Sequence, residues 1–276
     1  MKNINIYEGD SYLFHKENLE NHPSAKLDST KELKLEKAFL EYEDAFVTDD
    51  LKSLTPYTFL SEEEKKKHLN LYNHTNNDDN RFHKLLNTLL TDEKGRKQYC
   101  PLCEINTANT LDHILPKKVD NGFPEFCDMP LNLFPMCGEC NTNKGEKWLD
   151  TTGSMKYLNL YRDELPNVQF LFVSVNLDNS ILTPNFFLKT DILDISISKK
   201  LKNTFFDLRI KNKYDEQGCL VFDEIKAAIQ ILKKYETNKD IIKQNIRNDR
   251  NQLNYWKDVL FRECMDNADV FDFLYV

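Results

Sequence analysis

The chain has 276 residues, a formal net charge of −8, 40% hydrophobic residues and 12% aromatic residues. This length allows one large or two small domains with a proper core. The 7 glycines argue against a β-sandwich with many tight turns, and the sequence has neither a G-x-x-x-x-G-K-[ST] nor a G-x-G-x-x-G pattern, so we expect no ATPase activity in this chain.

The first residues, MKNINIYEGD, lack the apolar core of a signal peptide, and no stretch approaches 18 consecutive apolar residues. The chain has seven cysteines, and four of them form a metal-binding pattern. This usage fits a protein of a reducing compartment better than one held together by disulfides. We therefore expect a soluble, cytoplasmic protein.

Residues 1–28 are polar with scattered aromatic side chains and predict a strand or loop followed by a short helix. Apolar residues recur at near-helical spacing in 29–46 and 80–90, which predicts two helices. Between them, Ser61 and Glu64 form a capping box that predicts a helix over 60–75. Three histidines lie on these helices, and we expect solvated or capping roles rather than metal binding: His68, His74 and His83.

Two Cys-x-x-Cys pairs follow, Cys100 with Cys103 and Cys137 with Cys140. Four thiolates suit one tetrahedral ion, and zinc is the metal that such a set favours. The spacer, residues 104–136, is longer than the roughly 15–20 residues of common zinc ribbons, so the ion would hold together the two ends of a longer insert. The alternative is four buried free thiols. The other cysteines are expected to be core or surface thiols: Cys127, Cys219 and Cys264.

The insert contains the dipeptide Asp112-His113. Neutral imidazole, with an ordinary pKa of about 6.5, can accept a proton from water, so His113 is a candidate general base. The carboxylate of Asp112 offers the oxygen that Mg²⁺ prefers, and Asn141, fixed by the adjacent Cys140, offers a second. Neighbouring side chains of a regular strand point to opposite faces, although they can converge at a strand end. A structural role for the histidine is the alternative.

The segments CPLC, LDHILPK, LNL and CGECNTNKG occur in this order within residues 99–148, and they resemble the HNH endonucleases, whose site is a ββα-metal unit. The resemblance implies that His113 activates water and that Asp112 and Asn141 hold one divalent metal at the scissile phosphate. It also implies that Asn132 holds the loop that orients His113, and that Lys144 lies near the phosphate. An oxygen-rich site containing Asn141 favours Mg²⁺ or Mn²⁺, whereas a histidine there would favour Ni²⁺ or Zn²⁺.

After this motif, residues 148–165 are predicted as a helix that ends before Pro166. Residues 169–177 and 181–188, with a turn at Asp178-Asn179, predict a β-hairpin. Further helices are expected over 191–208, 223–235 and 237–265. The last of these carries basic residues that either face phosphate or form an ordinary solvated face: Lys239, Lys243, Arg247, Arg250 and Lys257.

We therefore predict an α+β fold: a mostly helical chain with a central HNH ββα-metal unit stapled by a four-cysteine zinc site, and a C-terminal β-hairpin plus helices. The expected regions are a helical part over 1–92, the HNH core with its zinc over 93–150, and a hairpin and helical part over 151–276 that packs with the rest as one unit.

From residue 60 onward, the order of segments (LDHILPK, FPEF, PLNLFPMC and YRDELP) is similar to the HNH subunits of bacterial Septu-type and retron-associated anti-phage systems. This resemblance implies DNA cleavage in a defence complex with a separately encoded ATPase. Residues 94–147 contain 7 basic and 7 acidic residues, which disfavours tight DNA binding by this chain alone. Two other interpretations stay open: cleavage of RNA such as tRNA, and a non-enzymatic zinc-stapled binding module.

Overall fold

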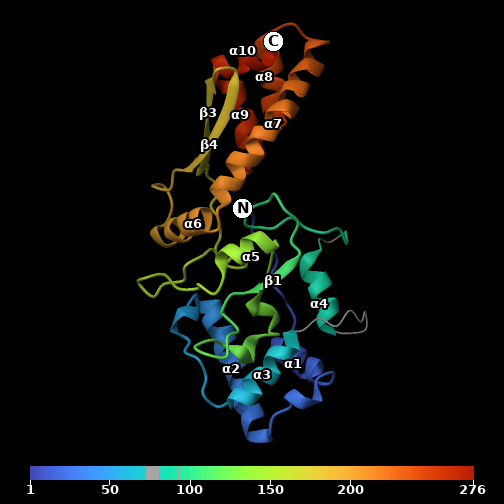
Figure 1. Ribbon diagram of the computed structural model, residues 1–276, viewed down its shortest axis with the longest axis vertical. Coiled ribbons are helices and arrows are strands. Elements are labelled where there is room, and N and C mark those ends of the chain that lie inside the picture. The colour runs from blue at the N-terminus through green and yellow to red at the C-terminus, as the bar shows by residue number, and fades with distance from the viewer. Residues whose placement is uncertain (73–80, 92–93) are drawn as a thin grey trace. The chain divides into compact units, whose positions relative to one another are not determined.

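The computed structural model describes residues 1–72, 81–91 and 94–276 (Figure 1). It divides into two compact units, one comprising Lys2–Glu164 and the other Leu165–Val276 together with Met1. The first unit thus combines the predicted helical region and the predicted core, and it extends past residue 150 to Glu164. The described residues contain ten α-helices and two antiparallel two-stranded sheets, which confirms the α+β class.

Helices form the N-terminal part of the first unit: α1 (Ser11–Leu19), α2 (Ser29–Thr48), α3 (Glu62–Leu69) and α4 (Arg81–Leu90). Side chains just before the first three helices accept backbone N–H groups of the first turn: Asp10, Asp28 and Ser61. The predicted capping box of Ser61 and Glu64 is confirmed. The helix predicted over 60–75 is shorter, because a 3-10 turn over Asn70–Tyr72 replaces it after Leu69. His74 lies outside the described residues, as does the side chain of His83.

The centre of the first unit is a ββα arrangement of β1 (Thr110–His113), β2 (Leu133–Met136) and α5 (Gly138–Lys144) (Figure 1). The strands are antiparallel, and Asp112 pairs with Phe134 and His113 with Leu133. Two 3-10 turns, Pro124–Phe126 and Pro130–Asn132, lie in the connection between the strands. The predicted order of two strands and a helix is therefore present.

Aromatic residues of α2 pack against the first of these 3-10 turns. The ring of Phe126 lies 5.6 Å from that of Phe39 and 5.0 Å from that of Tyr42, both in edge-on geometry that favours aromatic pairs. All three residues are almost completely buried. This contact joins the N-terminal helices to the loop that leads into β2.

The helix predicted over residues 148–165 is absent, and the segment consists of turns and extended stretches with an isolated bridge between Leu149 and Met155. Short polar side chains bind the backbone locally and so compete with a helix. The carboxylate of Asp150 accepts N–H groups of Thr152 and Ser154. Near the other end, the carboxylate of Asp163 accepts the N–H of Asn159.

The second unit contains the predicted hairpin, β3 (Leu171–Asp178) and β4 (Ile181–Leu188), with its turn at Asn179 and Ser180 rather than at 178–179. Both turn residues have positive φ, 48° and 64°, as a tight hairpin turn requires. Five helices follow: α6 (Ile195–Asp207), α7 (Ile210–Lys233), α8 (Lys239–Asn248), α9 (Trp256–Asp266) and α10 (Ala268–Tyr275). Helix α7 packs against β4, and α9 packs against β3 (Figure 1).

Two helix predictions in this unit were wrong in their limits. Helix α7 begins at Ile210, well before the predicted residue 223, and the segment predicted as one helix over 237–265 is broken between Asn248 and Trp256. No helix among the described residues combines the length and apolar character needed to cross a membrane.

The basic residues of α8 and its neighbourhood pair with side chains of the same unit. Three of them contact carboxylates at 2.5–3.6 Å: Lys239 with Asp272, Arg247 with Asp266, and Arg250 with Asp258. Lys257 pairs with Glu224, and the ammonium of Lys243 lies 4.5 Å from the ring centre of Phe271. The positive charges of these basic residues are therefore compensated locally, which favours an ordinary solvated face over a phosphate-facing surface.

Gly218 allows α7 to approach β4 closely. A Cβ atom at this position would lie 2.8 Å from Cγ of Pro184 and 3.3 Å from a ring carbon of Phe186. We expect Gly218→Val to lower the free energy of unfolding by about 1–3 kcal/mol through this steric conflict, measured by urea denaturation. Cys219→Val, which places the same residue on an exposed neighbouring position, is the control and should stay within about 0.5 kcal/mol of wild type. Equal effects of the two changes would contradict this interpretation.

Candidate metal centre and active site

The four predicted cysteine ligands come together. Their sulfur atoms lie within 4.8 Å of one another, and all four residues are buried. The sulfurs of Cys103 and Cys137 are 3.9 Å apart, which is too far for a disulfide. Four buried sulfurs without disulfides form a donor set that fits a metal such as zinc: Cys100, Cys103, Cys137 and Cys140.

Hydrogen bonds of the backbone fix the position of both cysteine pairs. In the first pair, the N–H of Glu104 donates to the carbonyl of Cys100 at 2.8 Å, and Glu104 has a φ of 53° that closes the turn. The second pair lies at the start of α5, where the N–H of Gly138 donates to the side chain of Asn109 at 2.9 Å. Because Asn109 immediately precedes β1, this contact and the cysteine cluster together fix α5 beside the strand.

Asp112 lies on the side of β1 that faces α5. Its carboxylate is 2.5 Å from the ammonium of Lys144, which also donates to the backbone carbonyl of His113 at 2.9 Å. Burial raises the pKa of the Asp112 carboxyl, and the charge of Lys144 opposes that shift. The same two residues line a mostly apolar pocket with Phe134 and Trp148. Asp112 and Lys144 thus form a direct ion pair, and the expected position of Lys144 near a phosphate stays a prediction.

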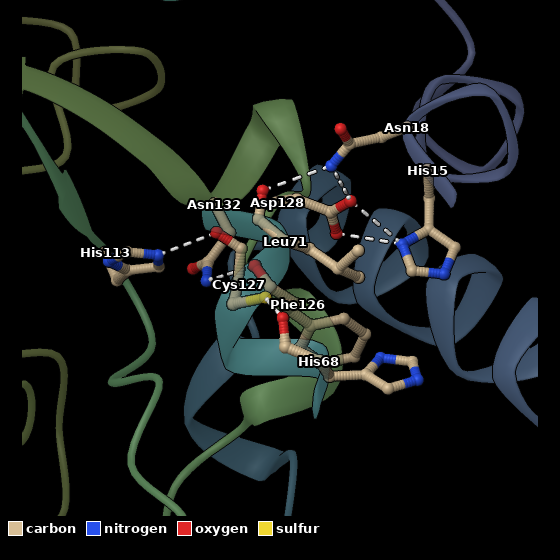
Figure 2. Close-up of polar contacts among 9 residues, drawn as sticks. All are labelled: His15, Asn18, His68, Leu71, His113, Phe126, Cys127, Asp128 and Asn132. Carbon is tan, nitrogen blue, oxygen red and sulfur yellow. Dashed lines mark hydrogen bonds and ion pairs between the residues drawn. The ribbon is translucent and has the colours of Figure 1, made fainter. Parts of the chain in front are cut away.

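His113 points away from this ion pair. Its side chain is only 6% exposed, and its ring lies 4.6 Å from that of Tyr72. Its Nε2 atom is 2.8 Å from the carbonyl oxygen of Cys127 (Figure 2). Since a carbonyl only accepts hydrogen bonds, Nε2 carries the proton and Nδ1 keeps a lone pair. Burial, followed by the charge of Lys117, lowers the pKa of His113 to about 3, so the ring is neutral at pH 7.

Asn132 holds the loop that follows His113. Its side-chain oxygen accepts the N–H of Leu115 at 2.8 Å and the hydroxyl of Tyr42 at 3.2 Å. Its amide nitrogen donates to the carbonyls of Leu115 and Phe126 at 3.2 and 3.1 Å. This completely buried side chain therefore joins the end of β1, the 3-10 turn before Cys127 and helix α2.

Asn141 lies one turn of α5 before Lys144 and is partly exposed. Its amide nitrogen donates to the hydroxyl of Thr110 at 3.2 Å. Thr110 and Asp112 are two residues apart on β1 and so share one face of the strand. Asn141 and Asp112 therefore lie on the same side of β1, whereas the imidazole of His113 lies on the other.

Sequence reasoning missed two neighbours of His113. The ammonium of Lys117 lies 3.3 Å from the ring centre of Tyr72, whose ring in turn contacts that of His113. Burial lowers the pKa of Lys117, and the charge of Asp112 opposes that shift. Lys117 could have been noticed because it stands four residues after His113 in the same motif. Nothing in the sequence around Tyr72 indicates its role, because it comes from the distant segment after α3.

His68 corrects a prediction. It is neither solvated nor a cap, because its side chain is completely buried and its ring lies 5.6 Å from that of His15. Its backbone carbonyl accepts the thiol of Cys127 at 2.8 Å (Figure 2). Helix α3 turns this histidine inward although its surroundings in the sequence are charged.

We expect the purified protein to contain zinc at about one ion per chain, as a single tetrahedral four-sulfur site implies. Cys140→Ser should abolish stoichiometric zinc and lower the unfolding temperature, because binding of a structural metal contributes directly to folding. Metal content is measured by mass spectrometry and unfolding by calorimetry. Cys219→Ser, at an exposed cysteine, is the control. Retention of zinc by Cys140→Ser would contradict the assignment.

The buried His68 makes stability depend on pH. Burial lowers its pKa to about 4, below the value of about 6.5 of an unfolded chain. The unfolded state therefore binds more protons between these values, and stability falls as pH decreases from about 6.5 towards 4, by up to about 1.4 kcal/mol per pH unit. His68→Phe should lose less stability over this range, measured by urea denaturation at each pH. Parallel pH profiles of the two proteins would contradict the assignment.

Comparison with known proteins leaves the family of the chain open. No protein-family model matches it, and no solved structure matches it. It is similar to Protein ea31 of Escherichia phage lambda, with 25% identity over 191 residues that cover 62% of this chain and 62% of that protein. The chain thus spans less than two thirds of the length of this relative, whose name states no activity.

Proposed function

We propose that the protein is a metal-dependent endonuclease of the HNH type that hydrolyses phosphodiester bonds of nucleic acid. The observation that carries the proposal is the ββα unit, in which a cluster of four cysteines fixes α5 against the strand that ends in Asp112 and His113. The resemblance of the four sequence motifs to HNH endonucleases supports the same assignment.

In this proposal His113 is the general base. The neutral ring has its Nε2–H occupied by the carbonyl of Cys127, which leaves the lone pair of Nδ1 for a proton of the attacking water. Within the described residues no hydrogen bond to Nδ1 occurs. A neutral, oriented imidazole is the form that such a step requires.

The oxygens of Asp112 and Asn141 would hold one Mg²⁺ or Mn²⁺ ion. The fit rests on the donor set, since both side chains lie on one side of β1 and offer the hard oxygen ligands that these ions prefer. When bound, such an ion supplies charge that stabilises the phosphate and the leaving oxygen. Lys144 and Lys117 add positive charge of the protein itself, which suits an anionic substrate.

We further propose DNA as the substrate and an ATPase as the partner, in an anti-phage defence complex. The charge distribution supports a partner. Residues 165–276 contain 16 basic and 16 acidic residues, whereas residues 2–164 contain 21 basic and 29 acidic residues. The unit with the candidate site thus carries the entire net charge of −8, and strong affinity for a polyanion has to come from another surface.

A second candidate, a non-enzymatic zinc-stapled binding module, is favoured by the contacts of the two central residues. Asp112 already pairs with Lys144, and His113 is buried with a bound Nε2. Both side chains therefore also serve as structural groups. If this candidate is correct, loss of the basic nitrogen of His113 has no effect on function.

The test is cleavage of supercoiled plasmid and of tRNA, by the chain alone and with any ATPase that copurifies from its host, in Mg²⁺, Mn²⁺ or chelator. His113→Gln keeps a donor for the carbonyl of Cys127 but has no basic nitrogen. We expect it to retain zinc and fold while losing at least about 10²-fold in cleavage rate.

Cys219→Ser is the matched control and should cleave as wild type does. Cleavage of tRNA but not plasmid would replace DNA by RNA as substrate. Wild-type rates in His113→Gln, or no cleavage of either nucleic acid with the partner present, would contradict the proposal and favour the binding module.

A further inference from the structure

A buried polar cluster lies directly behind the carbonyl group that binds His113. The residue after Cys127 is Asp128, which has no exposed surface. Its carboxylate lies 2.8 and 3.1 Å from Nδ1 of His15, and the amide nitrogen of Asn18 donates to it at 2.8 Å (Figure 2). His15 and Asn18 are one turn apart on α1 and are themselves completely buried.

Burying this polar cluster costs free energy that an apolar core in the same place would not cost. Transfer of a carboxylate from water to the protein interior is unfavourable unless it is paired and hydrogen-bonded. Burial alone would raise the pKa of Asp128, but the imidazole of His15 and the hydrogen bonds from His15 and Asn18 lower it below its usual value, so the carboxylate is ionised. Apolar side chains could join α1 to the loop just as well. One use of the buried carboxylate of Asp128 is therefore to hold the backbone of the loop in a specific position.

The peptide group between Cys127 and Asp128 is held on both sides. On one side the thiol of Cys127 donates to the carbonyl of His68. On the other side the carboxylate of Asp128 is fixed by α1, and Asn18 also donates to the carbonyl of Leu71 at 3.2 Å. The carbonyl oxygen of Cys127 belongs to this peptide group, and it is the atom that accepts the proton of Nε2 of His113.

We propose that Asp128, fixed by His15 and Asn18, is a positioning residue that sets the tautomer of His113 by holding the carbonyl of Cys127 in place. The two tautomers of a free imidazole differ little in energy, so a well-placed acceptor decides which nitrogen carries the proton. With the proton on Nε2, Nδ1 is available as a base. With the proton on Nδ1, the same ring cannot accept a proton from the proposed water.

This inference deepens the proposed function and rests on it, because the role of the tautomer matters only where His113 is the base. The geometry of the cluster around Asp128 does not make it a second metal site. Among the described residues, the cysteines alone bring three or more candidate ligand atoms together.

The experiment uses a matched pair of substitutions in the full chain. His15→Asn keeps a donor close to the position of Nδ1 but leaves a space where the ring was. His15→Phe keeps the ring and removes the donor. Asp128→Asn is a third variant that preserves shape and removes the charge. The tautomer of His113 is measured by long-range ¹H–¹⁵N correlation at pH 8 on zinc-loaded protein labelled in its 6 histidines, with His113→Gln for assignment.

We expect wild type and His15→Asn to carry the proton of His113 on Nε2. His15→Phe and Asp128→Asn should show a mixture with the Nδ1–H form, and their kcat should fall roughly 10- to 100-fold with little change in KM. A purely structural role predicts a different result. The changes in tautomer and kcat would then parallel the fall in unfolding temperature, and His15→Asn, which leaves a space unfilled, would be affected at least as much as His15→Phe.

Retention of the Nε2–H tautomer by folded His15→Phe and Asp128→Asn would overturn the inference. The tautomer is read without any cleavage assay, so the two proposals fail separately. Wild-type protein that does not cut nucleic acid contradicts the proposed function. Variants that cut but keep the wild-type tautomer contradict only the role of Asp128.

Discussion

The arrangement of the first unit depends on the contact of four sulfur atoms at the junction of a loop, a strand and a helix. Strands β1 and β2 have 4 residues each and α5 has 7. A two-stranded sheet and a helix of this size are marginal by themselves in water. Their mutual position therefore has to be imposed by tertiary contacts. The cysteine cluster, together with the hydrogen bond from Gly138 to Asn109, joins the loop before β1 to the first turn of α5.

The candidate active site consists of two groups of residues separated by β1. On the side of α5 lie Asp112, Lys144 and Asn141, and on the other side the imidazole of His113 contacts Tyr72 and the carbonyl of Cys127. The alternation of side chains along a strand accounts for this division. Any chemistry that uses both groups has to take place at the carboxyl end of β1, where the strand stops and the chain turns towards Lys117.

The sequence allowed prediction of the parts of the fold that depend on local pattern. The cysteine cluster, the capping box at Ser61 and the hairpin over 171–188 followed from residue spacing and pattern. The ββα order followed from the resemblance of the motifs to HNH endonucleases. The helix predicted over 148–165 failed because Asp150 and Asp163 bind nearby backbone groups, which a periodicity argument ignores.

Tertiary contacts explain what the sequence did not reveal about the site. Tyr72, His15 and His68 contact the region of His113 and Cys127 from segments far away in the sequence. The inward orientation of His68 depends on packing against His15, and no local pattern encodes it. The motif did contain Lys144, which contacts Asp112 directly, and Asn132, which holds the loop that follows His113.

The uneven charge of the chain has a consequence for its behaviour in salt. A protein that attracts nucleic acid releases counterions on binding and loses affinity as salt increases. Residues 2–164, with their excess of acidic groups, repel a polyanion instead, and added ions weaken that repulsion. Any steep loss of affinity with ionic strength in a complex would therefore report on the basic surface of the other component, and this chain would contribute the opposite trend.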